Sequence, residues 1–216
     1  MIRVADTQVI DILKKSILAD GFDMVLDLEK SQGSRIYDAK NKRTLVDFFS
    51  FFASNPLGFN HPRMHEKEFE QKLLTYTRTK VSNSDIYTAG YAEFVQSFHK
   101  ICAPMFDRFF FIEGGGLGVE NALKTAQDWK VRMNLKAGKG EKGTQVMHFK
   151  EAFHGRTGYT MSLTNTVPDK VMYFPKFDWP RITNPKQTFP VTPESTRQVE
   201  ALEAQAIQEM KTAFET

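Results

Sequence analysis

A short apolar run that leads straight into a cluster of glycines constrains the fold of this chain more than any other feature. Residues 108–112 (Arg-Phe-Phe-Phe-Ile) have the continuous apolar character of a buried strand. Glycines occupy positions 114, 115, 116 and 118, and a helix is predicted from about Leu117 to Asn134. A second short strand is predicted at residues 145–149. The order strand, glycine turn, helix, loop, strand predicts a βαβ unit in an α/β fold.

The glycine turn is the first candidate binding site. Glycines between a strand and a helix allow a ligand to approach the backbone closely, and the positive end of the helix favours a phosphate. The turn lacks the Gly-Lys-Ser/Thr ending of an ATP-binding P-loop and the Gly-x-Gly-x-x-Gly spacing of a dinucleotide site. A phosphate of another kind is therefore expected, and the alternative is a tight turn that binds nothing.

A second candidate site follows the next strand, at residues 151–159 (Glu-Ala-Phe-His-Gly-Arg-Thr-Gly-Tyr). The carboxyl ends of parallel strands face the ligand crevice of an α/β sheet. Phe153 could stack there on a planar ring, and Arg156 could bind a carboxylate through two hydrogen bonds. Taken alone, the segment favours an ordinary loop that buries Phe153 and exposes Arg156.

The rest of the chain is predicted as short elements around this unit. Asp6 or Thr7 is expected to cap a first helix that ends near Gly21, and Thr88 to cap a later one. The run at residues 48–53 is too apolar for an exposed loop, and six prolines between residues 168 and 193 should prevent regular structure although their aromatic neighbours predict packing. The other expected elements are a strand at 24–28 followed by a turn at 31–34, a hairpin of 35–37 with 44–49, helices at 64–78 and 89–103, and a last helix that Thr192 caps and Pro193 begins.

Composition excludes several classes of protein. With 216 residues, 41% hydrophobic and 25% charged, the chain is typical of globular domains and not of disordered or fibrous proteins. Its net charge of +3 is dispersed, so no nucleic-acid surface is expected. The single cysteine, Cys102, is expected to pack rather than react, and it favours a cytoplasmic protein. We expect no membrane span, because no stretch approaches the roughly 18 uncharged apolar residues that one requires. We also expect no metal site, because His61 and His65 have no third ligand nearby.

With these motifs in view, the chain resembles the class III, fold type I aminotransferases that depend on pyridoxal 5′-phosphate. The Phe-His-Gly-Arg loop at 153–156 is typical of that class. Residues 119–124 (Val-Glu-Asn-Ala-Leu-Lys) and 128–130 (Asp-Trp-Lys) favour the branch that acts on the terminal amine of L-lysine. The resemblance implies the N-terminal segment of the small domain over residues 1–65 and the first, incomplete part of the large-domain sheet over 66–216.

The resemblance also implies roles for individual residues. Gly115 and Gly116 would donate backbone N–H groups to the cofactor phosphate, Phe153 would stack on the pyridine ring with His154 beside it, and Arg156 would bind the carboxylates of L-lysine and 2-oxoglutarate. The amine would pass from lysine to the cofactor, releasing the 6-semialdehyde, and then to 2-oxoglutarate, giving L-glutamate. Family members of this kind are expected to act as homodimers.

Two groups that the chemistry requires have no match in this chain. The Schiff-base lysine and the acidic partner of the cofactor ring are expected beyond Thr216, and neither Lys124 nor Lys150 stands in a matching motif. The 216 residues are therefore expected to be inactive alone. Two alternatives stay open: another class III enzyme with ornithine or 4-aminobutyrate as donor, and a non-catalytic half-domain that acts as an interaction partner.

Overall fold

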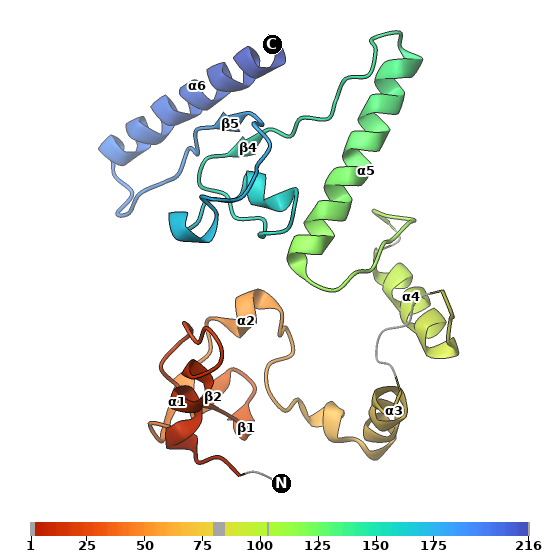
Figure 1. The fold of residues 1–216 in the computed structure, drawn as a ribbon, viewed down its shortest axis with the longest axis vertical. Coiled ribbons are helices and arrows are strands. Elements are labelled where there is room, and N and C mark those ends of the chain that lie inside the picture. The colour runs from red at the N-terminus through yellow and green to blue at the C-terminus, as the bar shows by residue number, and fades with distance from the viewer. Residues whose placement is uncertain (1–2, 80–84, 103, 216) are drawn as a thin grey trace. The chain divides into compact units, whose positions relative to one another are not determined.

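The computed structural model describes residues 3–79, 85–102 and 104–215, which form two compact units, Met1–Lys100 and Ile101–Thr216. The first unit contains a small antiparallel sheet and several helices, and the second contains two long helices and a parallel strand pair (Figure 1). The domain boundary expected after residue 65 concerns a longer protein and stays a prediction. Across the described ranges, no helix combines the length and the apolar character that crossing a membrane requires.

The sheet of the N-terminal unit has the strand order β1 (Leu26–Gln32), β2 (Arg35–Asp38), β3 (Arg43–Val46), with antiparallel pairing throughout. The predicted hairpin is thereby confirmed. The predicted turn at 31–34 is only half right, because β1 continues through Gln32, which pairs with Arg35. The chain reverses at the two residues between them.

A buried carboxylate closes the hairpin between β2 and β3. The side chain of Asp38 is fully buried and accepts hydrogen bonds from the backbone N–H of Val25 (3.1 Å), from Asn41 Nδ2 (2.7 Å) and from Arg43 Nε (3.2 Å). Burial alone would raise the pKa of Asp38, but these hydrogen bonds outweigh it and lower the pKa to about 2. The ionised form of Asp38 is therefore part of the folded hairpin.

The helices of this unit agree with the sequence only in part. The helix after Thr88 forms as predicted, the helix predicted from Met64 begins at Lys67, and the short helix Ser50–Ala53 was not predicted. Thr88 Oγ1 accepts a hydrogen bond from the backbone N–H of Tyr91 (3.2 Å), as a cap should. The predicted capping by Asp6 or Thr7 is wrong: both lie inside a 3₁₀ turn, no side chain caps the helix, and it ends at Lys14, well before Gly21. The elements are η1 (Asp6–Gln8), α1 (Val9–Lys14), α2 (Ser50–Ala53), η2 (Pro62–His65), α3 (Lys67–Thr77) and α4 (Ala89–Cys102), the last of which crosses into the second unit.

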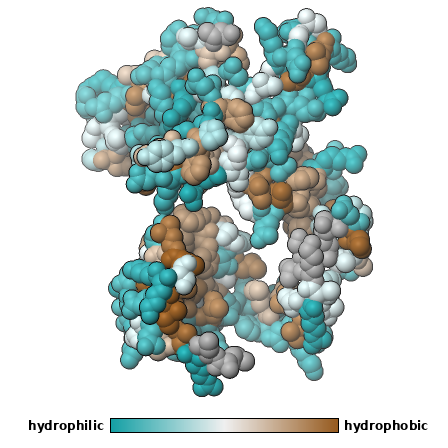
Figure 2. Space-filling model, viewed as in Figure 1, coloured by the Kyte–Doolittle hydropathy of each residue, from teal (hydrophilic) through white to brown (hydrophobic). Residues whose placement is uncertain are grey.

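The apolar run at 48–53 is exposed, contrary to expectation. Phe49 forms an edge-to-face cluster with Phe22 (5.2 Å between ring centroids) and Phe52 (4.7 Å). Phe48 and Phe52 nevertheless remain 95% and 89% exposed, and Figure 2 shows apolar side chains at the surface of both units. The rings cover one another only partly, because the described part of this unit places no further layer over them.

The C-terminal unit is built on the parallel pair β4 (His148–Phe149) and β5 (Arg181–Ile182). Helix α6 (Pro193–Glu215) packs against β5 (Figure 1), and its predicted cap is confirmed by a hydrogen bond from the Ser195 N–H to Thr192 Oγ1 (3.1 Å). The other elements are α5 (Gly115–Lys136), η3 (Thr160–Leu163) and η4 (Pro168–Lys170). Leu163, Val171, Trp179, Ile182 and Ala206 form the buried apolar core.

The strand predicted at 108–112 does not form, so the βαβ unit is incomplete. Residues 108–112 are not part of a strand in the described chain, and Phe110 is 72% exposed. The face of α5 predicted to point inward is also open, with Trp129 largely exposed beside a hollow of about 570 Å³. A buried strand needs neighbouring strands on its edges, and no described strand of this unit pairs with these residues.

The proline-punctuated segment is more regular than predicted, because β5 lies within it. Its packing is confirmed where Phe177 and Trp179 stack on each other (4.8 Å between centroids) and on Tyr159 from the preceding loop (5.3 and 6.2 Å). The prediction fails for Tyr173 and Phe189, which remain almost fully exposed. The segment between the prolines is therefore folded, but it leaves Tyr173 and Phe189 almost fully exposed.

Candidate active site

Helix α5 begins at the glycine cluster with an open N-terminus. Gly114 precedes the helix with φ +89° and ψ 132°, a backbone conformation that favours glycine, and no side chain caps the first turn. The N–H groups of Gly115, Gly116 and Leu117 have no acceptor inside the helix, as in the first turn of any α-helix. With the positive end of the helix dipole, these groups form an arrangement suited to an anion.

The second candidate segment meets this turn through backbone contact. Gly155 has φ +114°, and a Cβ placed on it would lie 2.8 Å from the Cα of Gly116. A Cβ placed on Gly116 would lie 3.5 Å from Thr157 Cγ2, an ordinary contact. The structure thus brings the glycine turn and the Phe-His-Gly-Arg loop together at this one point, and only Gly155 lacks room for a side chain.

Two threonines that the sequence analysis did not single out hold the loop from behind. Thr164 Oγ1 donates to the carbonyl of Gly155 (2.6 Å) and accepts from the backbone N–H of His154 (2.9 Å). Thr160 Oγ1 accepts from the backbone N–H of Thr157 (3.0 Å). Both threonines are buried, so the loop is fixed by hydrogen bonds that are shielded from water.

A carboxylate from α5 holds the same loop from the helix side. Glu120 Oε2 accepts a short hydrogen bond from Thr157 Oγ1 and a longer one from the Tyr159 N–H (3.4 Å). Glu120 stands one turn after Gly116, on the same face of the helix. That spacing was visible in the sequence, but only the fold places the loop opposite it.

The candidate ligand-binding side chains remain accessible. Phe153 is 62% exposed, Arg156 is exposed and His154 is half-buried. No hydrogen bond or ion pair holds the Arg156 guanidinium among the residues that the structure describes. These side chains project from a loop whose backbone is fixed, which is the arrangement a preformed binding site requires.

The two lysines set aside on sequence grounds both have structural partners. Lys150 Nζ lies 3.1 Å from Glu209 Oε1 and 3.1 Å from Thr183 Oγ1. Lys124 Nζ lies 3.9 Å from Glu120 Oε1 and 5.8 Å from the centre of the Tyr159 ring. Their contacts account for both ammonium groups within the unit.

His148 is a titratable group buried near the loop. Its Nδ1 lies 3.1 Å from the carbonyl of Val146, while Nε2 is buried without a hydrogen-bond partner among the described residues. Burial lowers the pKa of His148, and the hydrogen bond to Val146 opposes this only in part. The imidazole therefore belongs to the folded core in its neutral form.

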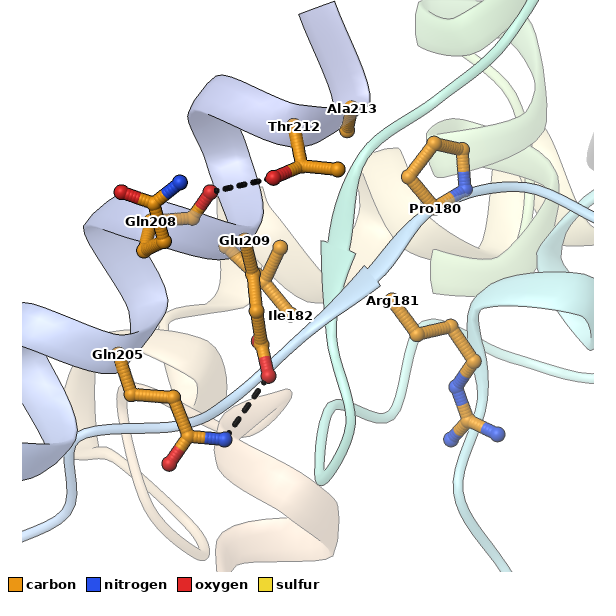
Figure 3. Close-up of a pocket in the computed structure, with 8 residues that line it drawn as sticks. All are labelled: Pro180, Arg181, Ile182, Gln205, Gln208, Glu209, Thr212 and Ala213. Carbon is orange, nitrogen blue, oxygen red and sulfur yellow. Dashed lines mark hydrogen bonds between the residues drawn. The ribbon is translucent and has the colours of Figure 1, made fainter.

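A separate hollow of about 580 Å³ lies between α6 and β5 (Figure 3). None of the predicted site residues lines it. Its one carboxylate, Glu209, accepts hydrogen bonds from Gln205 Nε2 (2.9 Å), Thr183 Oγ1 (2.9 Å) and Lys150 Nζ (3.1 Å). The hydrogen bonds of Glu209 are thus made within the unit, and we set this hollow aside as a binding site.

The residues at the glycine turn fit a phosphate-bearing group. The helix N-terminus is uncapped, and a Cβ on Gly114 or Gly115 would meet nothing within 4 Å, so no neighbouring residue crowds these two positions. Within the described ranges, no three side chains of the metal-ligating kinds come together. The arrangement can therefore bind an anion and present an aromatic ring and an arginine beside it.

Comparison with known proteins identifies relatives over nearly the whole chain. The family model described as aminotransferase class-III matches residues 17–216. The L-lysine-epsilon aminotransferase of Mycobacterium tuberculosis (strain ATCC 25618 / H37Rv) is 47% identical over 209 residues, which cover 95% of this chain and 46% of the relative. The enzyme of the same name from Streptomyces clavuligerus is 45% identical over 207 residues, covering 94% of this chain and 44% of the relative.

A solved structure agrees with the sequence comparison. The lysine aminotransferase from M. tuberculosis superposes with a TM-score of 0.86 at 45% identity, covering 98% of this chain and 49% of that one. The chain thus spans about half the length of the relatives it matches.

Proposed function

Because the chain belongs to the class III aminotransferases, we propose that the complete protein transfers the terminal amine of L-lysine to 2-oxoglutarate. The products are the 6-semialdehyde and L-glutamate, and pyridoxal 5′-phosphate is the cofactor. The choice of lysine rests on the names of relatives that are 45–47% identical over almost all of this chain. The proposal extends to a cytoplasmic homodimer, in keeping with a lone cysteine and with the apolar side chains exposed on both units.

The observation that carries the proposal is the backbone contact between Gly116 and Gly155. It joins an open helix N-terminus to a loop that bears Phe153 and Arg156. Neither segment alone distinguishes a binding site from an ordinary turn. Together they offer anion donors, a stacking surface and a carboxylate-binding cation in one place, which are the three groups that a phosphorylated ring and an amino acid require.

For the cofactor, the residues act by binding and orientation. Gly115 and Gly116 donate N–H groups to the phosphate, and Phe153 stacks on the ring with His154 at its side. When bound, pyridoxal 5′-phosphate supplies the electron sink and carries the amine between the two half-reactions. The lysine that would hold it covalently is not assigned to any position of this chain.

For the substrates, Arg156 binds the carboxylate far from the reacting amine. A planar guanidinium makes two parallel hydrogen bonds to a carboxylate and fixes its direction, whereas an ammonium acts as a single point charge. Holding lysine by that end leaves its ε-amine free to reach the cofactor. The same guanidinium binds the α-carboxylate of 2-oxoglutarate.

Turnover of the complete protein with different donors tests this function. We expect glutamate to form from 2-oxoglutarate with L-lysine at a kcat/KM well above that with L-ornithine or 4-aminobutyrate. A preference for either of the other donors would mean that lysine is not the amine donor, while the assignment to the class III aminotransferases would stand. Absence of glutamate with all three donors in the cofactor-loaded protein would contradict the proposed activity itself.

The role of Arg156 is tested by its closest substitute. We expect Arg156→Lys to raise KM for both L-lysine and 2-oxoglutarate by about tenfold, since one of two charge-assisted hydrogen bonds is lost. Arg197→Lys is the control, because Arg197 pairs with Glu194 on the exposed face of α6 and should not affect KM. Equal KM values for the two variants would argue against Arg156 as the carboxylate ligand.

A further inference from the structure

We propose that Glu120 is a positioning residue, which orients Arg156 for substrate carboxylates by holding the next residue along the chain. The inference rests on the proposed function of Arg156 and adds a residue that does not itself touch substrate. Glu120 lies on α5, and its carboxylate contacts Thr157 and Tyr159 but not the Arg156 side chain among the contacts described above. The helix that presents anion donors at its first turn thus also fixes the arginine loop.

Arg156 sits between two backbone positions that are each restrained. On one side, the Gly155 carbonyl accepts from Thr164 Oγ1 and its Cα packs on Gly116. On the other side, Thr157 donates its N–H to Thr160 and its hydroxyl to Glu120. Because its backbone is already restrained, Arg156 loses less conformational freedom when it binds a carboxylate. Glu120 therefore contributes to substrate affinity without touching the substrate.

The charge of Glu120 makes it suited to this role. Its side chain is only 15% exposed, so an ionised carboxylate there needs partners that replace water. Thr157 Oγ1, the Tyr159 N–H and the more exposed Lys124 ammonium at 3.9 Å supply them. Two of these three partners belong to the loop, so the carboxylate is satisfied only when the loop lies against α5.

The decisive variants are Glu120→Ala and Glu120→Gln in the complete protein. We expect Glu120→Ala to raise KM for both L-lysine and 2-oxoglutarate about tenfold, the size of one lost hydrogen bond to a charged group, with a much smaller change in kcat. Glu120→Gln keeps an oxygen acceptor for Thr157 and should restore most of the affinity. Asp128→Ala is the matched control, because Asp128 on the same helix pairs, among the described residues, only with exposed Arg132 (2.8 Å).

A double-variant cycle separates positioning from general stability. If Glu120 acts through Arg156, Glu120→Ala should have little further effect on kcat/KM once Arg156 is replaced by alanine. Effects that simply multiply would show that Glu120 influences turnover by another route and would overturn the proposal.

Hydrogen exchange provides a readout that does not depend on activity. The Tyr159 amide donates to Glu120, so its exchange should speed up in Glu120→Ala and stay near the parent rate in Asp128→Ala. An unchanged exchange rate of the Tyr159 amide in Glu120→Ala would overturn the proposed positioning role of Glu120, even if lysine turnover is confirmed. Faster exchange in Glu120→Ala, in a protein that does not turn over lysine, would instead support the contact between Glu120 and the loop and contradict the proposed function.

Discussion

Gly155 and Gly116 contact each other through their backbones, 39 residues apart in the chain, and no side chain fits on Gly155. The contact sets the distance between the helix N-terminus and the arginine loop. We expect Gly155→Ala to lower the free energy of unfolding by about 2 kcal/mol, because alanine is strained at φ +114° and its Cβ would press on the Gly116 Cα. Urea unfolding of parent and variant measures this.

Gly116→Ala is the control for that substitution. Its added Cβ would lie 3.5 Å from Thr157 Cγ2, at ordinary contact distance, so stability should change by less than about 0.5 kcal/mol. Equal destabilisation by both substitutions would show that the two backbones are not in the contact described.

Phe153 should contribute to cofactor affinity and not to folding. Because its ring is largely exposed, Phe153→Ala should weaken the binding of pyridoxal 5′-phosphate about tenfold through lost stacking, with little effect on unfolding. Equilibrium dialysis of the complete protein measures the Kd. Phe189→Ala, at an exposed ring outside the site, should leave the Kd unchanged, and a matching loss in both variants would argue against stacking by Phe153.

His148 should make the fold sensitive to mild acid. Its folded-state pKa lies below the ordinary 6.5, so above that pH neither state binds the proton and stability is unaffected. As the pH falls below 6.5 the unfolded chain binds the proton first, and stability declines until the folded-state pKa is passed. Unfolding of the parent and of His148→Gln between pH 7 and 5 should show the parent losing more stability. An NMR titration of His148 with a midpoint at or above 6.5 would contradict this.

Glu209 should hold α6 against β5, and its contribution to stability should decrease in acid. The backbone N–H of Thr183 is the main cause that lowers the pKa of Glu209 to about 2, with Gln205 and Lys150 adding to it. A depressed pKa contributes stability that is present above about pH 4.5 and is lost as the pH falls towards 2. We therefore expect Glu209→Gln to lower the Tm at pH 7 and to match the parent more closely near pH 2.

The control for the anchor is Glu203→Gln, an exposed position on the same helix. It should leave the Tm and its pH dependence unchanged. A similar fall in both variants would mean that the charge of α6 matters rather than the bonds to β5.

Local patterns predicted the elements that local physics controls. The glycine cluster marked the start of α5, Thr88 and Thr192 marked helix caps, and the strand pattern gave the hairpin of β2 and β3. Each depends on interactions within a few residues, so the sequence carries the information directly. The strand at 108–112 was predicted wrongly because pairing depends on a neighbouring strand rather than on its own residues.

The candidate site divides in the same way. The sequence alone determined which groups are present: glycines before a helix, an aromatic ring and an arginine after a strand. Only the tertiary structure decided that Gly155 lies on Gly116 and that Glu120, Thr160 and Thr164 hold the loop. Those contacts join residues up to 39 positions apart, and no local pattern encodes a distance that the path of the whole chain sets.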